Sequence, residues 1–304
     1  MAQFTRDGLT LAYDEFGPGD ARKSIVLVHG FSSNKYENWK RMGWYDAIAG
    51  KGLRGLALDC RGHGESAKPH DPAAYDRRQM AGDVFALMDH VGIERAHLLG
   101  FSMGAHIALT AAMSDGGRID HLVVAGVGGR IFEPPRDPDG MAKAMEAESP
   151  DQIADPMMKS FRHFADEQKE DRLALAACSR GPREAITRDA LFAIRRPTLV
   201  IAGQRDELAG ILSPRDRNHD VLLAGVHEGH HAVLPGLRQR HALQDLTGLL
   251  VARVQERVAL RIVFRFAAQV LGSLHQQVAH HHLDGVAGST GRRQVHALEG
   301  RVVP

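Results

Sequence analysis

The segment best suited to nucleophilic chemistry is Gly100-Phe101-Ser102-Met103-Gly104, a serine with a glycine two residues away on each side. It follows a short apolar run, 96–99, that is typical of a buried strand, and it precedes an Ala-rich run that is typical of a helix. A serine in so tight a strand-to-helix turn needs neighbours without bulk, and Gly100 and Gly104 provide that room. The first amides of the helix then face any anion that forms beside Ser102. We therefore predict a nucleophilic serine at position 102.

Nucleophilic attack by a serine needs further groups. A histidine must remove the hydroxyl proton, an acid must hold that histidine in the right tautomer, and two fixed N–H donors must stabilise the oxyanion. Val26-Leu27-Val28-His29-Gly30-Phe31 is a strand that runs into a glycine turn, from which a backbone amide can face Ser102. We assign the two donors of the oxyanion hole to the amides of Phe31 and Met103. We interpret His29 as a structural residue that shapes this loop.

A third motif, Asp59-Cys60-Arg61-Gly62-His63-Gly64-Glu65-Ser66, also follows an apolar run. Together the three motifs resemble the α/β-hydrolase family, in which they occur in this order, and the resemblance spans about residues 4–210. It implies the α/β-hydrolase fold and a serine hydrolase that needs no cofactor. For Asp59, Arg61 and Ser66 the resemblance implies a role in bracing loops, and we favour that role over catalysis.

The resemblance also indicates where the acid of the triad lies. The apolar run 198–202 continues into Gly203-Gln204-Arg205-Asp206, at the point where the family places its acid. Asp206 is therefore our assignment, with Glu207 as the reserve candidate. The family's histidine follows one more strand, for which 220–225 is the candidate.

Three histidines compete for the role of the base: His227, His230 and His231. We prefer His230, because Gly229-His230 resembles the Gly-His pair of the family, and we keep His231 and His227 as alternatives. The segment 227–231 also matches the H-E-x-x-H zinc pattern, which requires a helix. The glycine within it favours a loop instead, so we predict no metal site.

Strands and helices alternate around these motifs. Residues 4–16 alternate in polarity around Asp7-Gly8, which predicts an antiparallel hairpin. Helical spacing of apolar residues predicts helices at 75–91 and 103–113. Buried strands are predicted at 24–28, 53–58, 96–99, 121–127 and 198–202. The alternation indicates an α/β fold with a mostly parallel, doubly wound sheet covered on both faces.

The alternation of predicted strands and helices stops at a proline-rich stretch near residue 134. We predict that 130–196 is a helical cap, inserted between the core segments 1–129 and 197–250. Parallel sheets bind ligands beyond the carboxyl ends of their strands, so such a cap would wall the pocket. Two interpretations stay open with equal weight for its large apolar side chains, which either line the pocket or pack the cap against itself. These side chains are Met141, Met145, Met157, Met158, Phe161 and Phe164.

The chain after Gly210 changes character. It holds ten of the 18 histidines, no lysine, and only Phe264 and Phe266 besides histidine as aromatic residues. We separate 251–304 as an atypical tail of uncertain structure, consistent with disorder or with out-of-frame translation. This observation motivates a second hypothesis: a catalytically impaired hydrolase-fold protein, either a binder or a frameshifted product, that lacks a proper base histidine.

The composition narrows the function classes. With 38 basic and 37 acidic residues the formal net charge is +1, so nucleic acid and membrane are not expected partners. Only Cys60 and Cys178 are present, too few for a disulfide framework. The first residues are polar and do not resemble a secretion signal, so we expect a cytoplasmic protein. Arginines interrupt the apolar stretch 246–272, so no transmembrane segment is predicted. The oligomeric state stays open.

These observations converge on a serine hydrolase that cleaves a carboxylic ester, or a related acyl bond, of a small organic substrate through an acyl-enzyme. In this prediction Ser102 attacks, His230 transfers the proton and Asp206 orients the histidine. A serine rather than an aspartate at the turn argues against the chemistry of haloalkane dehalogenases and epoxide hydrolases, whose members carry a carboxylate there. Hydrolysis of thioesters, lactones and carbon–carbon bonds, and perhydrolysis, stay open because they use the same residues.

Overall fold

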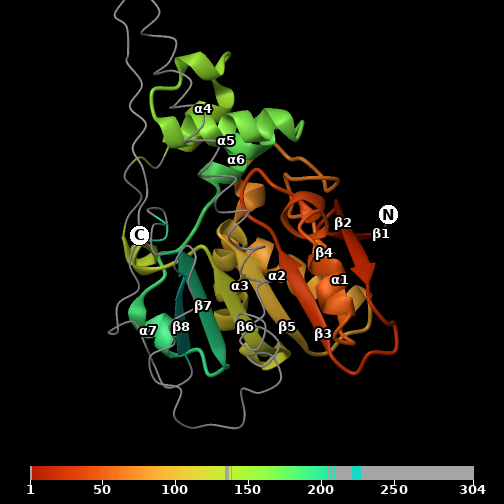
Figure 1. Cartoon of the computed structure of the whole chain (residues 1–304). Helices are drawn as coiled ribbons and strands as arrows, with labels where there is room; N and C mark the ends of the chain where they lie inside the picture. The colour runs from red at the N-terminus through yellow and green to blue at the C-terminus, as the bar shows by residue number, and fades with distance from the viewer. Residues whose placement is uncertain are drawn as a thin grey trace, which may run out of the picture.

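A mostly parallel sheet forms the centre of the molecule (Figure 1). The computed structural model describes residues 2–133, 137, 139–203, 206, 209 and 221–226. Within these residues the sheet has eight strands in the order β1-β2-β4-β3-β5-β6-β7-β8. The strands are β1 (Ala2–Arg6), β2 (Leu9–Phe16), β3 (Ser24–Val28), β4 (Arg54–Leu58), β5 (Ala96–Phe101), β6 (Ile119–Ala125), β7 (Thr198–Gly203) and β8 (Val221–Val226). Strand β2 is antiparallel to β1 and β4, whereas all the other neighbours among these strands are parallel, which confirms the predicted sheet.

The chain begins with the predicted hairpin. Asp7 and Gly8 have φ angles of 52° and 77°, the left-handed conformations that a two-residue type I′ turn requires. The turn sets a register in which Phe4 faces Leu11 and Ala2 faces Tyr13. Phe4, Leu11 and Tyr13 are all buried, so the hairpin packs its apolar side onto the core.

The two faces of the sheet carry separate hydrophobic clusters. Along β3, Val26 and Val28 belong to the cluster under the helices α2 (Arg77–His90) and α3 (Met103–Asp115), whereas Ile25 and Leu27 belong to the cluster that contains Trp39. This split follows from the two-residue period of a strand, and it explains why β3 is apolar at nearly every position. The predicted coverage of both faces is therefore confirmed.

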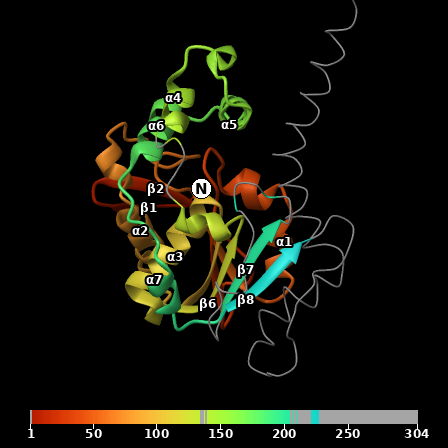
Figure 2. The same ribbon diagram turned by 90° about the vertical axis from the view of Figure 1, so that its left-hand side faces the viewer.

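Helices cover both faces of the sheet (Figure 2). The helices α2 (Arg77–His90), α3 (Met103–Asp115) and α7 (Arg188–Phe192) lie on one side, and α1 (Trp44–Ala49) lies on the other. The short helical segments are η1 (Tyr36–Lys40), η2 (Pro72–Tyr75), η3 (Gly116–Arg118), η4 (Gly129–Phe132) and η5 (Pro150–Gln152). No helix in the described part of the chain is both long and apolar enough to cross a membrane.

Several element ends differ from the predicted ones by one or two residues. Helix α2 begins at Arg77 rather than at residue 75, because the Asp76 carboxylate caps it by accepting a hydrogen bond from the Arg78 amide at 2.7 Å. Strand β6 ends at Ala125 rather than at residue 127, because Gly126 has a φ of 68° and turns the chain out of the sheet.

A cap of three helices stands over the end of the sheet at which the parallel strands finish (Figures 1 and 2). These helices are α4 (Gly140–Glu146), α5 (Pro156–Glu167) and α6 (Arg172–Arg180). Met145 is fully buried in the cap's own small core, with Met141 and Phe161 packed against that core. Met157, Met158 and Phe164 are half-buried. For Met145 the interpretation that the cap packs against itself is therefore confirmed.

The segment that we expected to belong to the cap, 130–196, also contains a helix of the core. Helix α7 lies beside the sheet and contacts α3, well away from α4 and α5 (Figure 1). The three helices of the cap thus end at Arg180, and the chain returns to the core before β7 begins.

A buried ion pair ties the loop after β4 to helix α2. The Arg61 guanidinium donates to both oxygens of Asp83 at 2.8 and 2.7 Å, and the two side chains are only 1% and 2% exposed. Arg61 also donates to the Ala74 carbonyl oxygen at 2.6 Å, and Arg6 of β1 donates to Asp83 at 2.9 Å. The predicted bracing role of Arg61 is therefore confirmed.

We expect the substitution Asp83→Asn to lower the free energy of unfolding by about 3–5 kcal/mol, because it leaves a buried guanidinium without its carboxylate. Urea denaturation measures the change. The matched control is Glu184→Gln, which removes the exposed ion pair with Arg78 and should cost less than about 1 kcal/mol. Equal effects of the two substitutions would contradict this account of Arg61.

Candidate active site

Ser102 lies in the sharp turn between β5 and α3. Its φ and ψ angles are 51° and −113°, a conformation that residues with a side chain rarely adopt. The Ser102 amide donates to the Ala125 carbonyl oxygen at 2.8 Å, which ties the turn to the end of β6. The Ser102 carbonyl oxygen accepts from the Ala105 amide at 2.9 Å, which ties it to the first turn of α3. The predicted strand-to-helix turn is thus present and is held on both sides.

The two flanking glycines let this turn pack closely. A Cβ atom on Gly100 would lie 2.1 Å from the carbonyl oxygen of Gly104, and a Cβ atom on Gly104 would lie 2.1 Å from the carbonyl oxygen of Val28. Both distances are far below a van der Waals contact. The turn at Ser102 can therefore approach the end of β3 only because both positions are glycine, as the sequence predicted.

The loop after β3, residues 30–34, lies against the turn, and we call it the Gly30 loop. A Cβ atom on Gly30 would lie 3.5 Å from the Cβ atom of Ser102. The Gly30 amide donates to the Asn38 side-chain oxygen at 3.0 Å, and the Ser33 amide donates to the Gly30 carbonyl oxygen at 3.3 Å. Ser32 has a φ of 55°, so the loop is tightly curled.

The amides of Phe31 and Met103 have no backbone acceptor among the described residues. Met103 is the first residue of α3, so its amide belongs to the positive end of the helix dipole. Phe31 lies in the Gly30 loop, which approaches Ser102 from the side of β3. Both amides are therefore available as donors, and their assignment to the oxyanion hole stays a prediction.

His29 is fully buried, and both of its ring nitrogens are engaged. Nδ1 donates to the Gly30 carbonyl oxygen at 2.8 Å, and Nε2 accepts from the Cys60 amide at 3.0 Å. Burial lowers the pKa of His29 to about 4, so the ring is neutral near pH 7. The predicted structural role of His29 is therefore confirmed, because the ring has no nitrogen left to accept a proton from Ser102.

His63 is a second buried histidine in this region. Its Nδ1 donates to the Arg61 carbonyl oxygen at 3.0 Å, whereas its Nε2 has no hydrogen-bond partner in the described part of the chain. Burial, together with the neighbouring His29, lowers the pKa of His63 to about 3. The His63 and Phe31 rings meet in a T-shaped contact, with the centroids 5.8 Å apart. His63 is therefore a neutral ring that packs against Phe31 of the Gly30 loop.

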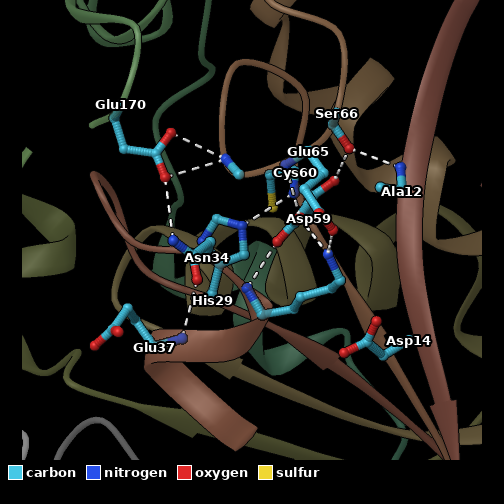
Figure 3. A network of polar contacts seen from close by, with 12 residues as sticks. Ala12, Asp14, His29, Asn34, Glu37, Asp59, Cys60, Glu65, Ser66 and Glu170 are labelled. Atoms are coloured by element: carbon cyan, nitrogen blue, oxygen red, sulfur yellow. Dashed lines mark hydrogen bonds and ion pairs between the residues drawn. The ribbon is translucent and has the colours of Figure 1, made fainter. Parts of the chain in front are cut away.

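Asp59 is the centre of a polar network that joins the loops after β3 and β4 (Figure 3). Its buried carboxylate accepts from the backbone amide and the Nζ of Lys35, both at 2.7 Å, and from the Glu65 amide at 2.9 Å. The Ser66 hydroxyl donates to the Asp59 carbonyl oxygen at 2.6 Å and accepts from the Ala12 amide at 2.9 Å. The bracing roles predicted for Asp59 and Ser66 are confirmed.

Glu170, between α5 and α6, is a residue of this region that the sequence analysis missed. Its two carboxylate oxygens accept from the Gly64 amide at 3.1 and 3.0 Å, and one of them accepts from the Asn34 side-chain amide at 3.2 Å (Figure 3). Asn34 was also missed, although Glu37 follows it at the spacing of a helix cap, a signal that points to such a role. Glu170 lies in a polar stretch and carries no comparable signal.

Asp206 follows β7 and is half-buried. Its carboxylate accepts a hydrogen bond from the Ala209 amide at 2.9 Å. The three candidate bases, His227, His230 and His231, lie outside the described residues, as do Glu207 and the zinc-like pattern. The assignments of the acid and of the base therefore stay predictions.

A family model for the alpha/beta hydrolase fold matches residues 23–187, more than half of the chain. The chain belongs to the α/β-hydrolase fold family. The match includes the Gly30 loop, the network around Asp59, the Ser102 turn and the three helices of the cap.

Two similar proteins illustrate the range of the family. The chain is 28% identical over 225 residues to the AB hydrolase superfamily protein YisY of Bacillus subtilis, and the alignment covers 67% of this chain and 81% of that protein. It is 39% identical over 88 residues to epoxide hydrolase B of Mycobacterium tuberculosis, an alignment that covers 29% of this chain but only 24% of that enzyme.

Solved structures support the same fold. A hydrolase from Pseudomonas aeruginosa superposes with a TM-score of 0.62 at 24% identity, over 82% of this chain and 97% of that one. The enol-lactonase from Burkholderia xenovorans also superposes with a TM-score of 0.62, at 22% identity, over 85% of this chain and 99% of that one. At these identities the likeness shows the shared architecture.

The buried state of His29 predicts a loss of stability in mild acid. Because its pKa falls from 6.5 to about 4 on folding, the unfolded chain binds more protons than the folded chain between those pH values. The contribution is present above about pH 6.5 and is lost as the pH falls towards 4. We expect His29 alone to account for about 2 kcal/mol of the decrease in the free energy of unfolding between pH 7 and pH 5.

Urea denaturation at the two pH values, on the native chain and on His29→Gln, measures this contribution. The variant should show the smaller decrease, whatever its stability at pH 7. His70→Gln, at an exposed histidine that lies 3.0 Å from Asp171, is the comparison, and it should reduce the decrease by less than His29→Gln does. An unchanged decrease in His29→Gln would show that His29 is not held neutral by burial.

Proposed function

We propose that this chain is a serine hydrolase that cleaves a carboxylic ester, or a related acyl bond, of a small organic substrate. The observation that carries the proposal is the backbone of Ser102, which holds its residue at a φ of 51° where β5 meets α3. Two nearby amides have no backbone acceptor among the described residues. The Phe31 amide belongs to the Gly30 loop, which lies against the turn, and the Met103 amide belongs to the first residue of α3.

In the proposed reaction the Ser102 oxygen attacks the carbonyl carbon, and the carbonyl oxygen becomes an oxyanion. The amides of Phe31 and Met103 stabilise this charge, with the positive end of the α3 dipole behind them. The base, for which His230 is our assignment, takes the hydroxyl proton and passes it to the leaving alcohol as the acyl–oxygen bond breaks. Water then attacks the acyl-enzyme and releases the acid. Asp206 is the proposed partner that orients the base.

The choice of an acyl bond over an epoxide rests on the nucleophile. Epoxide hydrolases are among the proteins that share local sequence with this chain, but that similarity covers about a quarter of epoxide hydrolase B. Opening an epoxide through an enzyme ester needs a carboxylate at the turn, and this chain has the hydroxyl of Ser102 there. A hydroxyl that attacks an acyl carbon forms an ester that water can hydrolyse, so turnover is complete.

The alternative function is a hydrolase-fold protein without turnover, a small-molecule binder or a frameshifted product. The composition after Gly210, with ten of the 18 histidines and no lysine, favours this alternative because the base must come from that segment. The two candidate functions share the fold and differ in whether Ser102 can be activated.

A fluorophosphonate probe separates these two functions. We expect the probe to label the folded native chain at Ser102 and a short p-nitrophenyl ester to be hydrolysed. Ser102→Ala should abolish labelling and lower kcat by at least about 10³-fold, with a thermal midpoint within a few degrees of the native value. Ser114→Ala, near the other end of α3, is the control and should keep both the labelling by the probe and the hydrolysis of the ester. A folded native chain that resists the probe would favour the inert alternative.

Separate substitutions identify the base. We expect His230→Ala to lower kcat by about 10³-fold or more, because an alanine cannot take the proton of Ser102. His231→Ala and His227→Ala, made in the same way, should keep most of the activity. Steady-state hydrolysis of the p-nitrophenyl ester provides the measurement. Full activity in all three variants would refute the placement of the base in this segment.

A further inference from the structure

A buried carboxylate, that of Glu170, joins the cap to the Gly30 loop. Glu170 is only 8% exposed, and its hydrogen bonds to Asn34 and Gly64 join residues that lie 136 and 106 positions apart in the sequence (Figure 3). Among the described residues Glu170 forms no ion pair. Its carboxylate oxygens accept hydrogen bonds from the Asn34 side-chain amide and the Gly64 backbone amide. A buried carboxylate held in this way adds little stability compared with an apolar residue, which points to a role in geometry.

Asn34 passes this contact on to the Gly30 loop. Its side-chain oxygen accepts from the Glu37 amide at 2.9 Å, while its side-chain NH₂ donates to Glu170. At the other end of the loop, Asn38 holds the Gly30 amide. The Phe31 peptide therefore lies between two anchored ends, and one of the anchors depends on Glu170.

A ring contact joins the same two parts of the molecule. The Phe31 ring meets Phe161 of α5 edge-on, with the centroids 6.1 Å apart, and meets His63 at 5.8 Å. The cap thus contacts the Gly30 loop twice, through the Phe161 ring and through the Glu170 carboxylate. Movement of α5 and α6 relative to the sheet would disturb the Phe31 peptide from both sides.

We propose that Glu170 is a positioning residue that couples the cap to the Gly30 loop and holds the Phe31 amide in the orientation that binds the oxyanion. The proposal rests on the function proposed above and deepens it. Glu170 does not touch the reacting atoms, and acts through Asn34 and Gly64. A substrate that holds the cap in this position would thereby keep the Phe31 amide oriented towards the oxyanion. The fit of the substrate against the cap would then affect the catalytic rate.

The substitution Asn34→Asp tests this coupling. The new carboxylate still accepts from the Glu37 amide, but it replaces the NH₂ group that faces Glu170 with a second acceptor. We expect kcat for the p-nitrophenyl ester to fall at least about tenfold with a smaller change in KM, because the oxyanion hole acts mainly in the transition state. A purely structural role would change the thermal midpoint and leave kcat of the folded fraction unchanged.

The double variant Asn34→Asp/Glu170→Gln provides a rescue. Its new amide group can donate to the new carboxylate while its amide oxygen still accepts from Gly64, so the contact is rebuilt with the donor on the other side. We expect kcat to return to within about threefold of the native value. Glu167→Gln, an exposed neighbour at the end of α5, is the matched control and should leave kcat unchanged.

The outcomes separate this proposal from the proposed function. A native chain that the fluorophosphonate labels, combined with an unchanged kcat in Asn34→Asp or with no rescue in the double variant, would overturn the role of Glu170 alone. A folded native chain without labelling would overturn both. If Asn34→Asp does not fold, Glu170→Ala takes its place, and the same loss of kcat is expected from it.

Discussion

Ser102 holds a backbone conformation that a residue with a side chain adopts only under constraint, and the surrounding elements supply that constraint. The end of β6 binds its amide, the first turn of α3 binds its carbonyl oxygen, and the end of β3 packs against Gly104. Three parallel strands and one helix must therefore be in place before the turn can exist. The order of the sheet, with β5 between β3 and β6, brings these groups to one point.

Several buried polar groups around this turn are satisfied by hydrogen bonds, whereas the hydroxyls of Ser32 and Ser33 and the Nε2 of His63 have no partner in the described part of the chain. The Asp59 carboxylate accepts hydrogen bonds from three N–H donors, and the Arg61 guanidinium donates to the Asp83 carboxylate. His29 is neutral, and both of its ring nitrogens are hydrogen-bonded. Leaving such groups unpaired would cost free energy, so each one restricts its loop to a single arrangement. The loops that approach Ser102 thus gain their rigidity from polar contacts as much as from packing.

The cap adds a different kind of constraint. It has a small core of its own around Met145 and Leu175, while Ala177 and Cys178 of α6 belong to the cluster under α2 and α3. It meets the Gly30 loop through Phe161 and Glu170. Helix α6 also contacts the core directly, because the Cys178 Sγ lies 3.8 Å from the Met103 Sδ beside the Ser102 turn.

Features that depend on neighbouring residues can be predicted from the sequence alone. The hairpin at Asp7-Gly8, the alternation of strands and helices, and the glycines around Ser102 follow from local sterics and periodicity, which are encoded within a few positions. Which side chains meet across the molecule is known only from the folded structure. That Glu170 contacts Asn34 depends on how the cap docks onto the sheet, and that Met145 is buried depends on how the helices of the cap pack on one another. Contacts between residues more than a hundred positions apart leave no local pattern, because they are selected by the packing of whole elements.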